Sequence, residues 1–310
     1  MLTAFETLYD LAVELQSNPS LKSLTLHHSP DKATVEARLR EGILHTLMAD
    51  EHVHSKWGKT RIFCRNYVNR AQGVVTPKQM VSLLATVEKL HPSEDERLAV
   101  LASTAAATFD VKRKKELVFA LEKITSREKL ASLNHQSYLE WVENRWTYWI
   151  NQQVDSIDID ELLCDLQVLY LNTNTKMPGI GLPLAANFFA DMGVTMFVKP
   201  DLHVTPIANM LTLTDGEVEA FKGLVKIAKF EREKLLRISK FNWLNEQGGL
   251  FPRHLDRLIY MIGSDNFLLN SQQSKRYAPN RRQLMRNTLI SGGLVSATYQ
   301  AQGELMRAMQ

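Results

Sequence analysis

Two short segments in the second half of the chain hold residues whose types and spacing could do chemistry. The first is 177–181, Met-Pro-Gly-Ile-Gly, and the second is 199–203, Lys-Pro-Asp-Leu-His. Two glycines one residue apart, with a proline before them, favour a tight hairpin whose backbone N–H groups point outward. Such N–H groups at the start of a helix bind anions. If the anion is a phosphate of DNA, the carboxylate of Asp201 could face the adjoining deoxyribose.

A carboxylate beside a sugar can assist cleavage of an N-glycosidic bond, because that reaction develops positive charge on the sugar. The carboxylate stabilises the cation and orients or deprotonates water, and general-base catalysis of this kind is worth ~10² to 10⁴ in rate. The alternative for Asp201 is a structural role as the N-cap of the next helix. Both roles are compatible, because a helix N-terminus keeps a carboxylate ionised.

Together the two segments resemble the helix-hairpin-helix (HhH-GPD) DNA glycosylases, the superfamily of endonuclease III, the adenine glycosylase MutY and the 8-oxoguanine glycosylases. The family hairpin reads roughly Leu-Pro-Gly-Val-Gly, which residues 177–181 match. A Gly-Pro-Asp or Val-Asp element follows in the family, with a histidine two residues after the aspartate. Pro200, Asp201 and His203 match this element, and Lys199 stands where the family has glycine. The resemblance is confined to residues 177–204.

This resemblance implies an all-α fold of two helical lobes with a cleft between them. Residues 81–225 would form the lobe that contains the hairpin and the catalytic aspartate, and residues 1–80 together with 226–310 would form the other. Asp201 would be the catalytic residue. The residues expected to bind DNA phosphate are Gly179, Ile180, Gly181 and His203. For His203, a structural role at a helix end is the alternative.

Pro183 marks a departure from part of the family. In members that also cut the DNA strand, a lysine stands two residues after the last glycine of the hairpin and attacks the sugar as an amine. Pro183 occupies that position here, where it suits the first turn of a helix. The resemblance therefore predicts a monofunctional glycosylase that uses water, removes a flipped-out damaged or modified base and leaves an abasic site. Strand cleavage is not expected, although Lys176 or Lys199 could supply an amine from elsewhere.

The segment 138–149 is dense in aromatic residues. Tyr138, Trp141, Arg145 and Trp149 are spaced to share one face of a helix. Glycosylases hold the everted base between aromatic or apolar side chains, so these four residues could line a base pocket. The alternative is that the stripe fills the core, as aromatic stripes at helical spacing usually do.

The rest of the sequence reads as almost entirely helical. Apolar residues recur at helical spacing in the segments 32–49, 77–91, 159–171 and 214–238, among others. The 310 residues are 45% hydrophobic and 23% charged, which is ordinary for a soluble globular protein. No apolar run is long enough to span a membrane, and the N-terminus does not resemble a signal peptide. With only two cysteines, the chain lacks the four-cysteine iron–sulfur cluster found in some members of the family.

The net charge of +3 is small, but basic residues gather in three segments that suit phosphate binding. These segments lie within 56–70, 112–115 and 275–286, and each could instead be an ordinary solvated surface. The residues His45, Asp50, Glu51, His52 and His54 lack the spacing of a catalytic zinc site, so we predict no metal.

We therefore expect a monomer that binds double-stranded DNA in the cytoplasm, at the nucleoid, with no membrane and no required cofactor. The family resemblance adds that the hairpin carbonyls could bind a monovalent cation. Two other interpretations remain open. The chain could be a DNA-binding protein that kept the hairpin and lost the chemistry, or a helical interaction protein in which Pro-Gly-Ile-Gly is only a turn.

Overall fold

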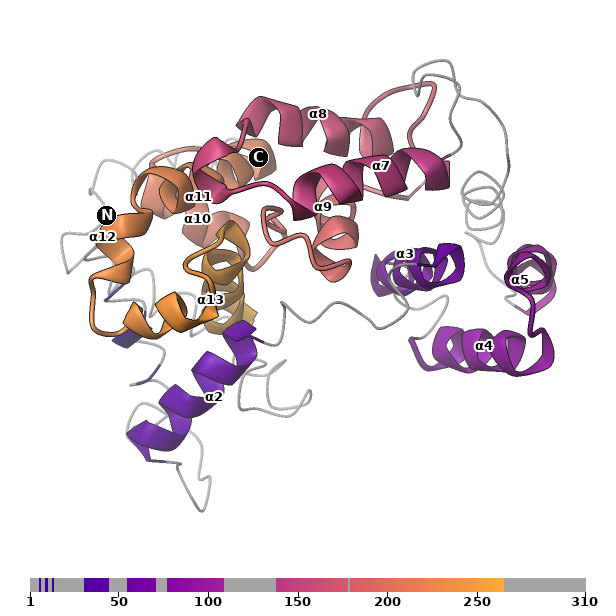
Figure 1. Ribbon diagram of the computed structural model, residues 1–310, viewed down its shortest axis with the longest axis horizontal. Helices are drawn as coiled ribbons and strands as arrows, with labels where there is room; N and C mark the ends of the chain where they lie inside the picture. The colour runs from indigo at the N-terminus through magenta and orange to yellow at the C-terminus, as the bar shows by residue number, and fades with distance from the viewer. Residues whose placement is uncertain are drawn as a thin grey trace, which may run out of the picture. The chain divides into compact units, whose positions relative to one another are not determined.

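The computed structural model describes residues 31–44, 55–70, 77–108, 138–177 and 179–264, together with Glu6, Tyr9, Asp10 and Val13. Within these ranges all regular secondary structure is helical and no strand occurs, which confirms the predicted all-α class (Figure 1). No helix in this part of the chain is long and apolar enough to cross a membrane.

The chain divides into two compact units. We call them the hairpin unit, Leu47–Phe197, and the aspartate unit, which combines Met1–Thr46 with Val198–Gln310. The boundaries thus fall at 47 and 198, whereas the sequence analysis placed them near 81 and 225. One reason is that helix α3 (Lys56–Arg70) packs against the helices of the hairpin unit. As a result, the hairpin and Asp201 belong to different units.

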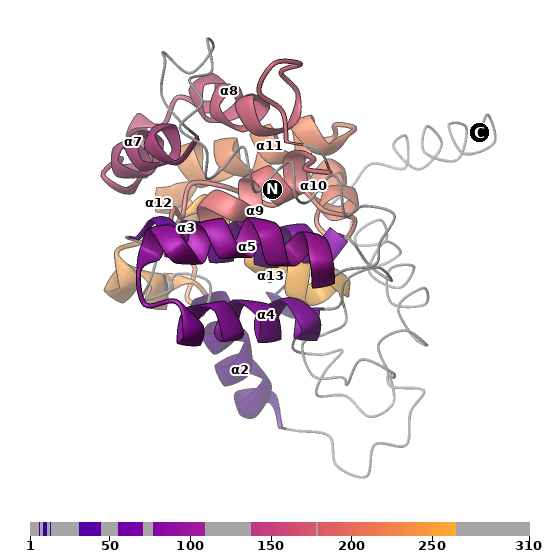
Figure 2. The ribbon, with the colours of Figure 1, turned by 90° about the vertical axis from the view of Figure 1, so that its right-hand side faces the viewer.

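The described part of the hairpin unit contains α-helices and one short 3₁₀ turn. The elements are α3, α4 (Pro77–Leu90), α5 (Glu94–Thr108), α7 (Tyr138–Ile150), η3 (Val154–Ser156), α8 (Ile159–Tyr170) and α9 (Leu182–Asp191). Helices α3, α4 and α5 pack against one another, and α9 packs on both α3 and α8 (Figure 2). The core includes Phe189, which stacks on Phe197 with ring centroids 4.7 Å apart.

The aspartate unit is built around α13 (Pro252–Ser264), which packs on α2 (Lys32–Leu44), α10 and α11. The remaining elements are α10 (Thr205–Thr212), α11 (Glu217–Phe230), α12 (Arg232–Leu236) and η4 (Asn242–Gln247). Helices α10 and α11 cross closely, because Gly223 of α11 faces Thr212 of α10. A Cβ atom at Gly223 would lie 2.6 Å from Cγ2 of Thr212. This packing fixes α10, and with it the segment that leads into α10 from Val198.

Candidate functional site

Helices α8 and α9 pack against each other and are joined by the glycine-rich segment (Figure 1). The N–H of Met177 donates to the carbonyl of Leu169 (2.8 Å), and the N–H of Ile180 donates to the carbonyl of Met177 (3.2 Å). The second bond closes a tight turn in which Gly179 has φ 76°, a conformation that favours glycine. The local arrangement is therefore two packed helices connected by a tight turn. Pro178 lies outside the described residues.

The turn leaves two of its three predicted N–H donors available to an anion. Gly181 is the N-cap of α9, and neither its N–H nor that of Gly179 has an acceptor among the described residues. The N–H of Ile180 closes the turn, so it is not available to a phosphate as the sequence analysis expected. Pro183 stands in the first turn of α9, where its missing N–H costs nothing. An anion here would meet Gly179 and Gly181.

Helix α3 braces the turn from one side. A Cβ atom at Gly179 would lie 3.1 Å from Cε2 and 3.2 Å from Oη of Tyr67, so only glycine fits the space without displacing that ring. Tyr67 is itself buried. The sequence pattern gave no sign of this contact, because more than a hundred positions separate the two residues in the chain.

Besides the contact of Tyr67 with the turn, a network of polar side chains links α3 to α9. The amide nitrogen of Asn187 donates to Oδ1 of Asn66 (2.7 Å) and to Oδ2 of Asp191 (3.0 Å). Arg65 forms an ion pair with the same carboxylate oxygen of Asp191 at 3.2 Å. Hydrogen bonds between buried amides hold two helices in one register, because slippage would leave polar groups unpaired. The network therefore fixes the position of α9, whose N-terminus carries the turn.

Asp201, the predicted catalytic residue, lies in the aspartate unit in a turn just before α10. Its Oδ1 accepts hydrogen bonds from the N–H groups of His203 (2.9 Å) and Val204 (3.1 Å). Its Oδ2 lies 3.3 Å from Nζ of Lys199, and 14% of the side chain is exposed. These bonds close the turn and use only one of the two carboxylate oxygens. The other oxygen faces a single ammonium group. Asp201 is not the N-cap of α10, because that position is held by Val204, which makes no side-chain cap bond.

A second carboxylate supports this segment from α13. Oδ2 of Asp256 accepts a hydrogen bond from the N–H of Lys199 (3.0 Å) and forms an ion pair with Arg253. Asp256 and Arg253 are 2% and 5% exposed. Burial raises the pKa of Asp256, while the Arg253 guanidinium and the Lys199 N–H act in the opposite direction. Sequence reasoning missed both residues, since a polar pair on a helix is normally expected to face solvent.

Basic and aromatic side chains surround the Asp201 segment. The ring of His203 meets Tyr260 edge-on at 5.6 Å. Nζ of Lys199 lies 6.0 Å from the Tyr260 ring centroid, and the guanidinium carbon of Arg257 lies 5.0 Å from it. Positive groups beside an aromatic ring are typical of surfaces that bind nucleic acid strands. His203 thus belongs to a basic cluster, and Arg257 and Tyr260 are members that the sequence did not reveal.

The aromatic stripe on α7 packs inside the hairpin unit. Tyr138, Trp141 and Trp149 are 1%, 8% and 1% exposed. Nε1 of Trp149 donates to Oδ2 of Asp165 (2.6 Å), and Trp141 packs edge-on against Phe189. These rings occupy the core, which is the packing alternative of the sequence analysis. Their burial leaves them no exposed face within this unit on which a base could stack.

Arg145, the polar member of the stripe, is also engaged in packing. Its Nε donates to Oδ2 of Asp165 (2.6 Å) and its Nη2 donates to Oε1 of Glu161 (2.7 Å). Burial raises the pKa of Asp165, opposed by the Trp149 hydrogen bond and by Arg145. Arg145 therefore joins α7 to α8 and has little freedom to read a base edge.

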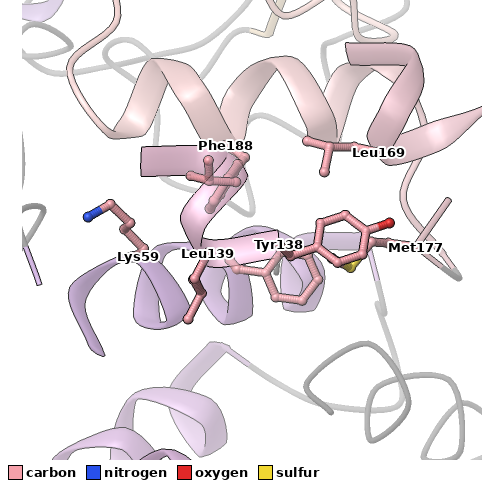
Figure 3. Close-up of a pocket in the computed structure, with 8 residues that line it drawn as sticks. Lys59, Tyr138, Leu139, Leu169, Met177 and Phe188 are labelled. Carbon is pink, nitrogen blue, oxygen red and sulfur yellow. The ribbon is translucent and has the colours of Figure 1, made fainter. Parts of the chain in front are cut away.

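A small cavity lies beside this stripe, between α3, α7, α8 and α9 (Figure 3). Tyr138 and Met177 are at one end, and Lys59 is at the other. The cavity volume is about 10 Å³, which corresponds to about one water molecule. A neighbouring cavity lined by Ile180 and Leu184, among others, has the same volume. Neither can hold a nucleobase.

Lys59 shows that one of the predicted basic segments is only partly a surface feature. Its side chain is 1% exposed, and its Nζ lies 2.5 Å from Oε2 of Glu143. It therefore cannot meet a phosphate. Arg65 of the same helix is 48% exposed and faces Asp191. The other two basic segments, at 112–115 and 275–286, lie outside the described residues.

The loose group of histidines and carboxylates between His45 and His54 also lies outside the described residues. Among the residues that are described, no group of three or more His, Cys, Asp or Glu side chains could hold a metal ion.

Comparisons with models of protein families, with curated proteins and with solved structures find no match to this chain.

Proposed function

We propose that the chain is a monofunctional DNA glycosylase that hydrolyses the N-glycosidic bond of a flipped-out damaged or modified base and leaves an abasic site. The observation that carries the proposal is the environment of Asp201. One of its oxygens is fixed by two backbone N–H groups, and the other faces a cation at the surface of the aspartate unit. A carboxylate in a fixed orientation, beside a position that favours positive charge, is what a developing sugar cation requires.

The ion pair with Lys199 supports this role. Oδ2 of Asp201 lies 3.3 Å from an ammonium group, so the position beside this oxygen already favours positive charge. A deoxyribose that is losing its base acquires the same charge. Lys199 is 24% exposed on a flexible stem, so its ammonium group can be displaced without rearranging the backbone. Water would then complete the displacement, with Asp201 as the orienting or accepting group.

Phosphate binding is assigned to the glycine turn and to the basic cluster. Gly179 and Gly181 each offer an N–H group, and the turn is held in place by α3. Lys199, His203 and Arg257 gather around Tyr260 in the aspartate unit. Groups of this kind bind DNA through its backbone and make affinity depend on salt. Because Pro183 replaces the amine of strand-cutting enzymes, we expect an abasic site as the final product.

A non-catalytic DNA-binding protein is the second candidate function. One observation favours it: both oxygens of Asp201 already have partners, which is a complete structural role for a residue that closes a turn. The two functions differ in a single property. Only a glycosylase should prefer a positively charged sugar at its binding site over a neutral one.

This property can be measured without knowing the base. We would compare binding to two DNA duplexes, one with a pyrrolidine in place of a deoxyribose and one with a tetrahydrofuran. The pyrrolidine carries the positive charge of the transition state, and enzymes bind such analogues at least ~10²-fold more tightly than neutral ligands. We expect a strong preference for pyrrolidine in the parent protein, and none in Asp201→Asn. The amide oxygen of asparagine can accept the same N–H groups of His203 and Val204, so this variant should fold normally.

Binding of the tetrahydrofuran duplex serves as the control. It should be similar in the parent and in Asp201→Asn, because the phosphate contacts do not involve this carboxylate. Equal affinity of the parent for both duplexes would refute catalysis and support the non-catalytic alternative. Absence of salt-dependent DNA binding altogether would refute both.

A further inference from the structure

We infer that Asp256 is a positioning residue that holds Asp201 in its working orientation through the backbone of Lys199. The inference rests on the proposed function, because it assigns a role toward the carboxylate that would stabilise the sugar cation. Asp256 is buried and does not touch the substrate. It acts on the segment 199–201, to which it is bonded from α13.

An unbroken series of hydrogen bonds connects the two carboxylates. Oδ2 of Asp256 accepts from the N–H of Lys199 (3.0 Å), and the carbonyl of Lys199 accepts from the N–H of Asp201 (2.8 Å). The second bond spans only two residues and closes a three-residue turn centred on Pro200. The fixed φ of proline suits such a turn. Asp201 then caps its own turn through His203 and Val204, so its side chain has one orientation.

The position of Asp256 makes a purely stabilising role a poor explanation for its charge. A buried ion pair is often no more stable than apolar residues of the same volume, because both ions lose their hydration. Arg253 compensates the charge of Asp256 from the preceding turn of α13. What an apolar residue could not do is accept the N–H of Lys199. Proline at 200 has no N–H, so Asp256 holds the one donor on the N-terminal side of Asp201 in this short segment.

Two positive and two negative side chains lie at the 199–201 segment and the part of α13 bonded to it. Lys199 and Arg253 are positive, Asp201 and Asp256 are negative, and the four sum to zero. Burial raises the pKa of Asp256, and the nearby charge of Asp201 adds to this effect. The two carboxylates are therefore coupled both through the backbone and through their charges. A change at residue 256 should be felt at residue 201, although residue 256 itself is sealed from solvent.

The test uses the full chain and the two analogue duplexes described above. In the double variant Arg253→Met with Asp256→Leu, the acceptor for Lys199 is lost together with the guanidinium that pairs with it. We expect its preference for pyrrolidine over tetrahydrofuran to fall by about tenfold or more, as is typical when a residue that orients an active group is lost. Tetrahydrofuran binding should change by less than about twofold, within the usual effect of a remote substitution. Asp256→Asn keeps an oxygen acceptor and should retain most of the preference.

Leu224→Ala is the matched control for loss of stability. Leu224 lies on α11 in the core of the same unit, fully buried, and it takes no part in the hydrogen bonds that hold the 199–201 segment. Its variant should melt at a lower temperature and keep the full preference for pyrrolidine. If the double variant also kept the preference, or if Leu224→Ala lost it to the same degree, Asp256 would have no positioning role. If the parent showed no preference at all, the proposed function itself would fail, and that result is distinct.

Discussion

Asp165 in the hairpin unit and Asp201 in the aspartate unit are similarly covered, with side chains 11% and 14% exposed, yet they are held in different ways. Asp165 receives two side-chain donors on one oxygen, Trp149 and Arg145, each at 2.6 Å. Asp201 receives two backbone donors on one oxygen and a lysine near the other. Exposure alone therefore does not separate a structural carboxylate from one that could act on a substrate. The hydrogen-bond and ion-pair partners of the carboxylate distinguish the two cases.

The cations paired with the two carboxylates, Arg145 and Lys199, differ in how firmly they are held. Arg145 is fixed by Glu161 as well as Asp165, and its guanidinium lies against the rings of Tyr148 (4.5 Å) and Trp149 (5.4 Å). A planar group with this many contacts is not exchangeable. Lys199 presents one ammonium group on a flexible stem, and another cation can replace it. Of these two carboxylates, only Asp201 is therefore paired with a cation that can be exchanged, as the proposed function requires.

The largest expected effect on stability comes from breaking the ion pair between Arg145 and Asp165. Arg145→Met should lower the free energy of unfolding by about 3 kcal/mol, because it leaves the Asp165 carboxylate without its cation in a mostly buried position. Urea unfolding followed by circular dichroism would measure this. A loss below about 1 kcal/mol would show that Arg145 is no more fixed than an exposed ion pair, and the contrast with Lys199 would fail.

Acid should weaken the aspartate unit through His254. Burial lowers the pKa of His254 from 6.5 to about 4, and its Nδ1 accepts a hydrogen bond from the N–H of Phe251. Because the unfolded chain binds the proton more readily than the folded one, stability is full above pH 6.5 and is lost as the pH falls toward 4. At pH 5 the loss is about 2 kcal/mol. Urea unfolding at pH 8 and pH 5 should show it.

The control for this pH dependence is His254→Gln, which keeps an acceptor but does not titrate. Its loss of stability between pH 8 and pH 5 should be smaller than that of the parent by about the same 2 kcal/mol. An identical pH dependence in both proteins would mean that His254 titrates normally and that α13 is more open to solvent than its burial indicates.

The glycine turn offers a smaller, matched comparison. Gly179 and Gly216 have similar positive φ angles, 76° and 85°, so alanine is strained at both. Only Gly179 has a neighbour in the way, since nothing lies within 4 Å of a Cβ atom at Gly216. At Gly216 the obstacle is the backbone itself, with ψ 166°, whereas Gly179→Ala must also displace the ring of Tyr67, at about 1 kcal/mol beyond its backbone strain. It should also weaken DNA binding, which Gly216→Ala should not; equal effects of the two substitutions on DNA binding would exclude the turn as a phosphate site.

Lys199→Met should have the smallest effect on stability, less than about 1 kcal/mol, because Asp201 loses one ammonium group at 3.3 Å and keeps its two backbone hydrogen bonds. The backbone N–H that donates to Asp256 is unchanged by this substitution. Thermal melting would test the prediction. A loss as large as that of Arg145→Met would show that the Lys199 ammonium is a fixed structural element, and not one that a substrate can displace.

Features set by neighbouring residues were predictable from the sequence. Periodic apolar residues predicted the helices, and α4 and α8 match the predicted segments 77–91 and 159–171 to within one residue at each end. Proline and paired glycines predicted the turn before α9, and Gly179 has the positive φ that this requires. Pro200 and Asp201 also predicted that a new helix begins shortly after them, and α10 begins at Thr205. Each depends on a stretch of a few residues.

Features that depend on contacts between distant segments were not predictable. Asp256 and Tyr260 reach the 199–203 segment only because α13 packs beside it, and Tyr67 reaches Gly179 only through the packing of α3. The buried position of Lys59 also depends on a helix far along the chain. The separation of α11 from α12 at Glu231 has no glycine or proline to announce it. The periodicity there predicted one continuous helix.

The most direct test of the central claim is the release of a base. Genomic DNA preparations that carry different base modifications would be incubated with the parent protein, and the aldehydes of new abasic sites would be labelled and counted. We expect abasic sites on at least one preparation, and a rate at least ~10²-fold lower with Asp201→Asn, which is the scale of loss for a single catalytic group. Equal release by both proteins, or normal DNA binding with no release from any preparation, would contradict the account.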